Sequence, residues 1–123
     1  MKENSKKYDL EERTLLFAKR IRLFLKKVPK SISNFEDSKQ LARASGSIGA
    51  NYIEANESLS KKDFSYRIKI CRKESKESRF FLNLIDTDEI MELSQERDEL
   101  IQEASELMNI FGAILRKTDG DTD

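Results

Sequence analysis

Apolar or small side chains recur between residues 64 and 85 at alternating steps of four and three residues. This spacing places them on one face of an α-helix and forms a heptad seam. We expect the helix over 61–86, because Ser60 and Asp63 stand before the pattern in a variant of the capping box. The seam consists of Phe64, Ile68, Cys71, Ser75, Ser78, Leu82 and Ile85.

Three further segments carry helical periodicity. The first, 8–28, ends before Pro29, because the residue that precedes a proline is disfavoured in helical geometry. The others are expected over 36–58 and 94–117, with a turn between 87 and 94 and a disordered acidic tail over 118–123. The predicted core positions are Leu10, Leu15, Phe17, Ala18, Ile21, Phe24, Leu25 and Val28 in the first helix, Leu41, Ala44, Ile48, Tyr52, Ala55 and Leu59 in the second, and Leu93, Leu100, Ala104, Leu107, Phe111 and Ile114 in the last.

Two short features refine this pattern. Ile32 and Phe35 are the apolar residues of the first connection, and we expect them to cover the end of the helical core. The middle of the second helix is built from small residues, and Gly46 and Gly49 would each cost about 0.5–1 kcal/mol relative to alanine there. Close approach of a neighbouring helix explains them best, and a kink is the alternative.

Four amphipathic helices with short connections favour an all-α fold, an antiparallel up-down-up-down four-helix bundle in a single domain over 1–123. Hydrophobic and charged residues each make up 37% of the chain, which is typical of long helices with wide polar faces. No apolar run has the length of a membrane span, and the N-terminal segment lacks the apolar stretch of a secretion signal, so we expect no membrane partner. The single cysteine, Cys71, is typical of a reducing, cytoplasmic environment.

The net charge of zero conceals an uneven distribution of charge. Residues 1–50 contain 12 Lys/Arg against 6 Asp/Glu, residues 51–85 contain 8 against 5, and residues 86–123 contain 3 against 12. Either the acidic last helix neutralises its basic neighbours within a bundle or across a subunit contact, or the basic helices face nucleic-acid phosphates while the acidic helix points elsewhere. In the second case the phosphate contacts are Lys19, Arg20, Lys26, Lys27, Lys30, Lys62, Lys69, Lys73 and Lys76.

Few groups in the sequence suggest a reaction. Histidine is absent, which excludes a histidine base, a Ser-His pair and most zinc sites. Glu54, Glu74 and Glu77 resemble the carboxylates of two-metal helical bundles, but the Glu-x-x-His pairs are missing, so we expect no metal and no cofactor. The alternative for these residues is a polar network between the second and third helices, formed by Asn51, Glu54, Lys73, Glu74 and Glu77.

Surplus apolar surface near the end of the third helix indicates self-association. Phe80, Phe81 and Leu84 widen the apolar face beyond what one seam requires. An extra apolar face on a small helical protein usually contacts another subunit. We therefore expect these three side chains to contribute to a homo-oligomer.

Several of these residues also carry a family resemblance. The matching segments are Ser47-Ile48-Gly49-Ala50-Asn51, Glu54-Ala55, Ser60 with Asp63-Phe64, Lys69-Ile70, and Lys73-Glu74-Ser75 with Glu77-Ser78 and Phe80-Phe81-Leu82. In this order they resemble the 23S ribosomal RNA intervening-sequence protein family. The resemblance implies a four-helix bundle that assembles into a ring-like homo-oligomer, commonly a pentamer.

Relatives of this kind include products of reading frames inserted in large ribosomal RNA genes. More distant ones are accessory proteins of diversity-generating retroelements, which are basic and associate with nucleic acid and a reverse transcriptase. The present chain differs from the most basic of them in its net charge of zero.

Two functions are therefore expected as alternatives. The first is a non-enzymatic homo-oligomeric scaffold that binds the RNA or DNA backbone through the first and third helices. The aromatic residues lie at core spacing and do not alternate with the lysines, so base stacking is not indicated. The second is a protein-interaction module that docks another protein, such as a reverse transcriptase, without nucleic acid. No catalytic set supports an enzyme.

Overall fold

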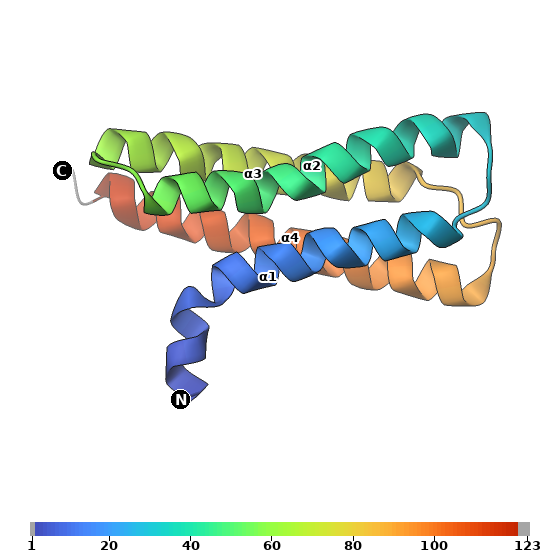
Figure 1. Cartoon of the computed structure of the whole chain (residues 1–123), viewed down its shortest axis with the longest axis horizontal. Helices are drawn as coiled ribbons and strands as arrows, with labels where there is room; N and C mark the ends of the chain where they lie inside the picture. The colour runs from blue at the N-terminus through green and yellow to red at the C-terminus, as the bar shows by residue number, and fades with distance from the viewer. Residues whose placement is uncertain (1, 121–123) are drawn as a thin grey trace.

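The structure is a computed structural model that describes the backbone of residues 2–120 and the side chains of residues 10–120. It contains four helices, α1 (Lys2–Lys27), α2 (Ile32–Asn56), α3 (Lys61–Leu84) and α4 (Met91–Gly120), and no strand within the described residues. Each helix runs antiparallel to the one before it and packs against two neighbours, in the order α1, α2, α3, α4 and back to α1. The predicted antiparallel four-helix bundle is confirmed (Figure 1).

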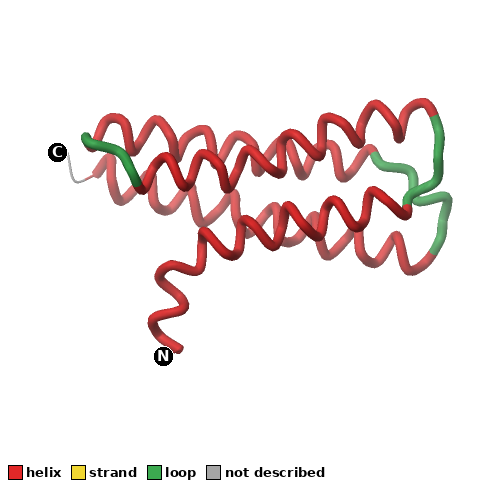
Figure 2. Tube along the Cα trace, in the orientation of Figure 1, coloured by secondary structure: helices red, strands yellow, loops and turns green. Residues whose placement is uncertain are grey.

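The three connections divide between the two ends of the bundle. The α1–α2 and α3–α4 turns lie at one end, and the α2–α3 turn lies at the other (Figure 2). Two serines define helix starts, because the Ser31 and Ser60 hydroxyls accept hydrogen bonds from the amides of Asn34 (3.1 Å) and Asp63 (3.0 Å). The cap at Ser60 was expected. The cap at Ser31 starts α2 four residues earlier than predicted, within the segment interpreted as a connection.

The outer ends of the first and last helices also extend further than predicted. Helix α1 begins at Lys2, and its first turns bend away from the other helices (Figure 1). Helix α4 begins at Met91, inside the predicted turn, and continues to Gly120. Residues 118–120 are therefore helical and not part of a disordered tail, whereas the rest of that predicted tail lies outside the described residues.

The core follows the predicted seams. In α3 the seam from Ile68 to Ile85 is buried, and Phe64 packs partly buried against it. Glu74 joins this buried face, which makes α3 more polar inside than its seam alone predicts. The largest fully buried side chains of the other helices are Phe17, Ile21, Phe24, Leu41, Ile48, Leu100, Leu107 and Phe111.

Four apolar residues predicted to be buried are instead exposed. Ile32 (86% exposed) and Phe35 (64%) lie outside because Asn34, between them, takes the inward position at the start of α2. Leu59 is 98% exposed, since α2 ends at Asn56 and its periodicity stops before residue 59. Leu15 is 53% exposed because the neighbouring Thr14 is buried in its place.

Thr14 of α1 lies directly against Gly49 of α2. Its hydroxyl donates to the carbonyl oxygen of Leu10 (2.7 Å), and a Cβ added at Gly49 would lie 2.9 Å from this hydroxyl oxygen. Real Cβ atoms almost never come so close, so a side chain at position 49 would force Thr14 or the helices to shift. At Gly46 the nearest atom is the flexible end of Arg22, at 3.2 Å. The expected close approach is confirmed, and Gly49 is the residue that permits it.

Asn34 joins the two turns at the other end of this helix pair. It is 2% exposed, and its side-chain amide donates to the carbonyl oxygens of Pro29 and Asp86, both at 2.9 Å. Its carbonyl oxygen accepts from the backbone amide of Asp86, also at 2.9 Å. One side chain therefore ties the α1–α2 turn to the α3–α4 turn, 52 residues along the chain.

Candidate nucleic-acid interface

The acidic residues of α4 are directed toward α1, where two arginines bind them. Arg13 donates to Glu103 (2.7 Å) and to Glu106 (2.8 Å), and Arg20, one heptad later, lies 3.2 Å from both Glu96 and Glu99. Hydrogen bonding with Glu103, which is the largest contribution, raises the pKa of Arg13 above its usual value. Between α1 and α4 the acidic helix therefore neutralises its basic neighbour, and Arg20 is engaged inside the bundle.

Four basic residues of α3, Lys69, Arg72, Lys73 and Lys76, lie on another side of α4, where no comparable acidic stripe faces them among residues 10–120. Together with α4 they line a groove of about 580 Å³, which we call the basic groove. Five cations and no carboxylate line it. The lining residues are Lys69, Arg72, Lys73, Lys76, Met108, Asn109, Gly112 and Arg116.

The five cations of the basic groove are free of ion pairs among residues 10–120, whereas Arg13, Arg20 and Arg43 all bind carboxylates there. A carboxylate, Asp119, lies next to the groove, in a hollow that it shares with Lys69, Arg72 and Arg116, and it accepts a hydrogen bond from the Ser65 hydroxyl (3.2 Å). Five cations without an ion pair among residues 10–120 are therefore gathered in one groove between α3 and α4.

Helical spacing explains how the sequence builds this groove. Lys69, Lys73 and Lys76 follow one another at steps of four and three residues, so they share one face of α3. Arg72 lies on the flank of that face nearest α4. The sequence prediction included neither the position of Arg72 beside Gly112 nor Arg116 as a residue of the groove. Both depend on how α3 and α4 are placed relative to each other.

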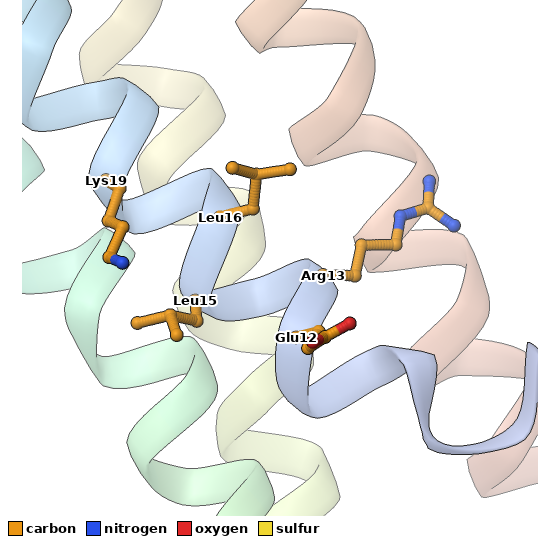
Figure 3. A pocket seen from close by; sticks show the side chains of 5 residues that line it. All are labelled: Glu12, Arg13, Leu15, Leu16 and Lys19. Atoms are coloured by element: carbon orange, nitrogen blue, oxygen red, sulfur yellow. The ribbon is translucent and has the colours of Figure 1, made fainter. Parts of the chain in front are cut away.

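The remaining predicted phosphate contacts do not gather into one site. Lys62 is exposed in the first turn of α3 and does not line the basic groove. Lys26 and Lys27 are exposed in the last turn of α1, and Lys30 lies at the turn that follows. Lys19 projects from the middle of α1 beside Leu15 and Leu16 (Figure 3). The structure thus brings together three of the nine predicted residues, all of them on α3.

Polar contacts do connect α2 with α3, but through arginines that the sequence pattern did not single out. Arg43 donates to Glu77 (3.1 Å) and lies 3.4 Å from the carboxylate of Glu74, a residue that is only 5% exposed. Arg67 donates to the side-chain oxygen of Asn51 (2.9 Å). Glu54 and Lys73 are exposed and take part in no side-chain hydrogen bond or ion pair among residues 10–120.

The structure offers little to a metal ion or to thiol chemistry. Among the described residues, no three His, Cys, Asp or Glu side chains are grouped so that they could hold a metal. Burial raises the pKa of Cys71 to about 12, and its thiol lies 3.4 Å from the carbonyl oxygen of Ile48. A thiol of this kind is almost entirely protonated near neutral pH.

Exposed apolar side chains include those predicted to form an oligomer contact and those at the first connection. On α3, Phe80 is 58% and Leu84 47% exposed, whereas Phe81 packs edge-on against Phe80 and partly against the core. At the α1–α2 turn, Ile32 and Phe35 line a second groove of about 630 Å³, together with Leu25, Val28, Pro29, Lys30, Ser31, Asn34, Glu36 and Ser38. None of the described helices combines the length and the apolar character needed to cross a membrane.

Comparison with known proteins finds a matching family model and a similar solved structure. The family model described as 23S rRNA-intervening sequence protein matches residues 6–113. A crystal structure of a protein of unknown function from the S23 ribosomal protein family of Bacteroides thetaiotaomicron VPI-5482 has a TM-score of 0.72 with this chain. The two chains are 26% identical, and the match covers 86% of this chain and 97% of the other. No curated protein matches.

Proposed function

The chain belongs to the 23S rRNA-intervening sequence protein family, and on this premise we propose that it is a non-enzymatic scaffold that binds the phosphate backbone of RNA or DNA through the basic groove. One observation carries the proposal. The cations of α1 that face α4 are neutralised by Glu96, Glu99, Glu103 and Glu106, whereas the five cations of the basic groove have no such partners among residues 10–120.

The expected binding mode follows from the groove's composition. Lysine and arginine bind phosphate oxygens, whereas sequence is read by contacts to base edges. The groove contains no aromatic side chain, so bases have no stacking platform there. The proposed interaction is therefore insensitive to sequence and depends steeply on salt.

A titration of fluorescently labelled RNA and DNA at two salt concentrations tests this function. A plot of log affinity against log salt concentration falls by roughly 0.7–0.9 per decade for each phosphate contact. A groove that uses three lysines therefore predicts a fall of at least about 2 per decade of salt. Changing Lys69, Lys73 and Lys76 to glutamine is expected to remove most of the binding. The matched control for net charge is the variant in which Lys19, Lys26 and Lys27 of α1 are changed to glutamine. Equal losses in the two variants, or no binding at low salt, would refute the proposal.

We also propose that the scaffold is a homo-oligomer, for which the family resemblance implies a pentameric ring. The exposed Phe80 and Leu84 support a contact on α3. Light scattering at several concentrations tests this, and Phe80→Asp with Leu84→Asp is expected to lower the mass. A wild-type protein that is monomeric at every concentration would contradict it.

The second candidate function, a protein-interaction module, rests on a different observation. Ile32 and Phe35 expose apolar surface beside a groove at the α1–α2 turn. Such a groove suits an apolar segment of another protein, and the resemblance suggests a reverse transcriptase as one partner. This function would be favoured over the first if the chain binds no RNA or DNA and a partner protein copurifies with the wild type but not with Phe35→Asp.

A further inference from the structure

Two arginines of the basic groove flank Gly112. The position that a Cβ of residue 112 would occupy lies 3.5 Å from Nη1 of Arg116 and 3.8 Å from Cδ of Arg72. Arg116 stands one helical turn beyond Gly112 on α4, and Arg72 reaches the same place from α3. The lack of a side chain at Gly112 leaves the floor between the two arginines open.

The surroundings of this point favour an anion. Within residues 10–120, neither Arg72 nor Arg116 forms an ion pair with a carboxylate, unlike Arg13, Arg20 and Arg43. Arg72 and Arg116 line the same groove as Lys69, Lys73 and Lys76, and this concentration of positive charge attracts an anion. Planar guanidinium groups bind phosphate oxygens in pairs of parallel hydrogen bonds, which a lysine ammonium group does not do.

We propose that Arg72 and Arg116, above Gly112, form a discrete subsite that binds one phosphate group with both guanidinium groups. Lys69, Lys73 and Lys76 then guide the rest of a polyanion along α3 without fixing its position. This inference rests on the proposed function for the identity of the long ligand. The chemistry of the subsite itself requires only a phosphate, either an internal phosphodiester or a terminal phosphate.

Charge-conserving variants test the subsite. Arg72→Lys and Arg116→Lys keep the net charge but lose the planar donors, so each is expected to weaken oligonucleotide binding about tenfold. Lys26→Arg, on α1 and outside the basic groove, is the control for a lysine–arginine exchange and is expected to leave the affinity within about twofold. Oligonucleotides with a 5′-phosphate and with a 5′-hydroxyl distinguish the source of the bound phosphate. Equal affinity for both indicates an internal phosphodiester, and a preference for the 5′-phosphate indicates a chain end.

A second variant supplies the anion from within the protein. Gly112→Asp places a carboxylate beside both arginines, and the contacts of its Cβ are of ordinary van der Waals length. We expect it to raise Tm above that of Gly112→Asn and to weaken oligonucleotide binding at least about tenfold, because its carboxylate occupies the subsite. Asn109→Asp adds the same charge elsewhere in the basic groove and is expected to weaken binding only about two- to threefold.

Thermal denaturation with inorganic phosphate separates this inference from the proposed function. Phosphate is expected to raise the Tm of the wild type above its value in chloride of equal ionic strength, and to have no such effect on Arg116→Lys. If phosphate acts in this way but no oligonucleotide binds, the subsite stands and the proposed function fails. If oligonucleotides bind while both lysine variants equal the wild type in affinity and in their response to phosphate, the subsite is wrong and the proposed function stands.

Discussion

Replacing Asn34 by alanine is expected to destabilise the bundle strongly, because this one buried side chain joins two turns. The substitution removes three hydrogen bonds of 2.9 Å. Two of them, to the backbone of Asp86, hold the α1–α2 turn to the α3–α4 turn, and the third, to Pro29, lies within the α1–α2 turn. Each contributes about 1 kcal/mol net, so the free energy of unfolding should fall by about 3 kcal/mol. For a domain whose whole stability is roughly 5–15 kcal/mol, this is a large fraction, and it corresponds to a fall in Tm of about 10 °C.

Urea denaturation followed by circular dichroism at 222 nm measures this change, provided that the slope with urea is the same for wild type and variant. Asn51→Ala is the matched control, because Asn51 also takes part in three hydrogen bonds, two to Ser47 and one from Arg67, but lies only half buried. Water can replace its bonds, so a loss of about 1 kcal/mol or less is expected. A loss below about 0.5 kcal/mol for Asn34→Ala would show that the two turns hold their places without this side chain.

Three further predictions concern single positions in the bundle. Gly49→Ala should lower stability by about 1–3 kcal/mol, because its Cβ would lie 2.9 Å from the Thr14 hydroxyl, whereas Gly46→Ala should be neutral or stabilising in the same urea titration. Glu89→Gly should raise stability by about 1 kcal/mol, since residue 89 has a φ of 58°; a lower Tm would contradict the assignment of strain to this turn. Cys71 should react with iodoacetamide at pH 8 about a thousandfold more slowly than a free cysteine. The free energy of unfolding should also fall between about pH 9 and 12, because the unfolded thiol loses its proton there and the folded one keeps it, and Cys71→Ala should flatten that fall.

The sequence alone predicted which faces of the helices are apolar, and most of those faces are buried. The α3 seam from Ile68 to Ile85 and the Ser60 cap were predicted because both are local properties. Helical periodicity acts over a few residues, and a capping serine acts within one turn. Errors arose where a polar residue replaced an apolar neighbour in the core, as Asn34 does between Ile32 and Phe35.

Which charged side chains pair with one another was decided only by the tertiary structure. Both interpretations of the uneven charge were open from composition. The ion pairs between α1 and α4 confirm neutralisation on one face of α4, and phosphate binding on the other face stays a proposal. The glutamates of α4 neutralise Arg13 and Arg20 of α1, while on the other side Arg116 joins the cations of α3 that have no ion pair among residues 10–120. The pairing of Arg13 with Glu103 spans 90 residues of chain. A pattern along one helix determines which side chains share a face, but the rotation and axial offset between helices determine what that face meets, and these depend on packing the whole core at once.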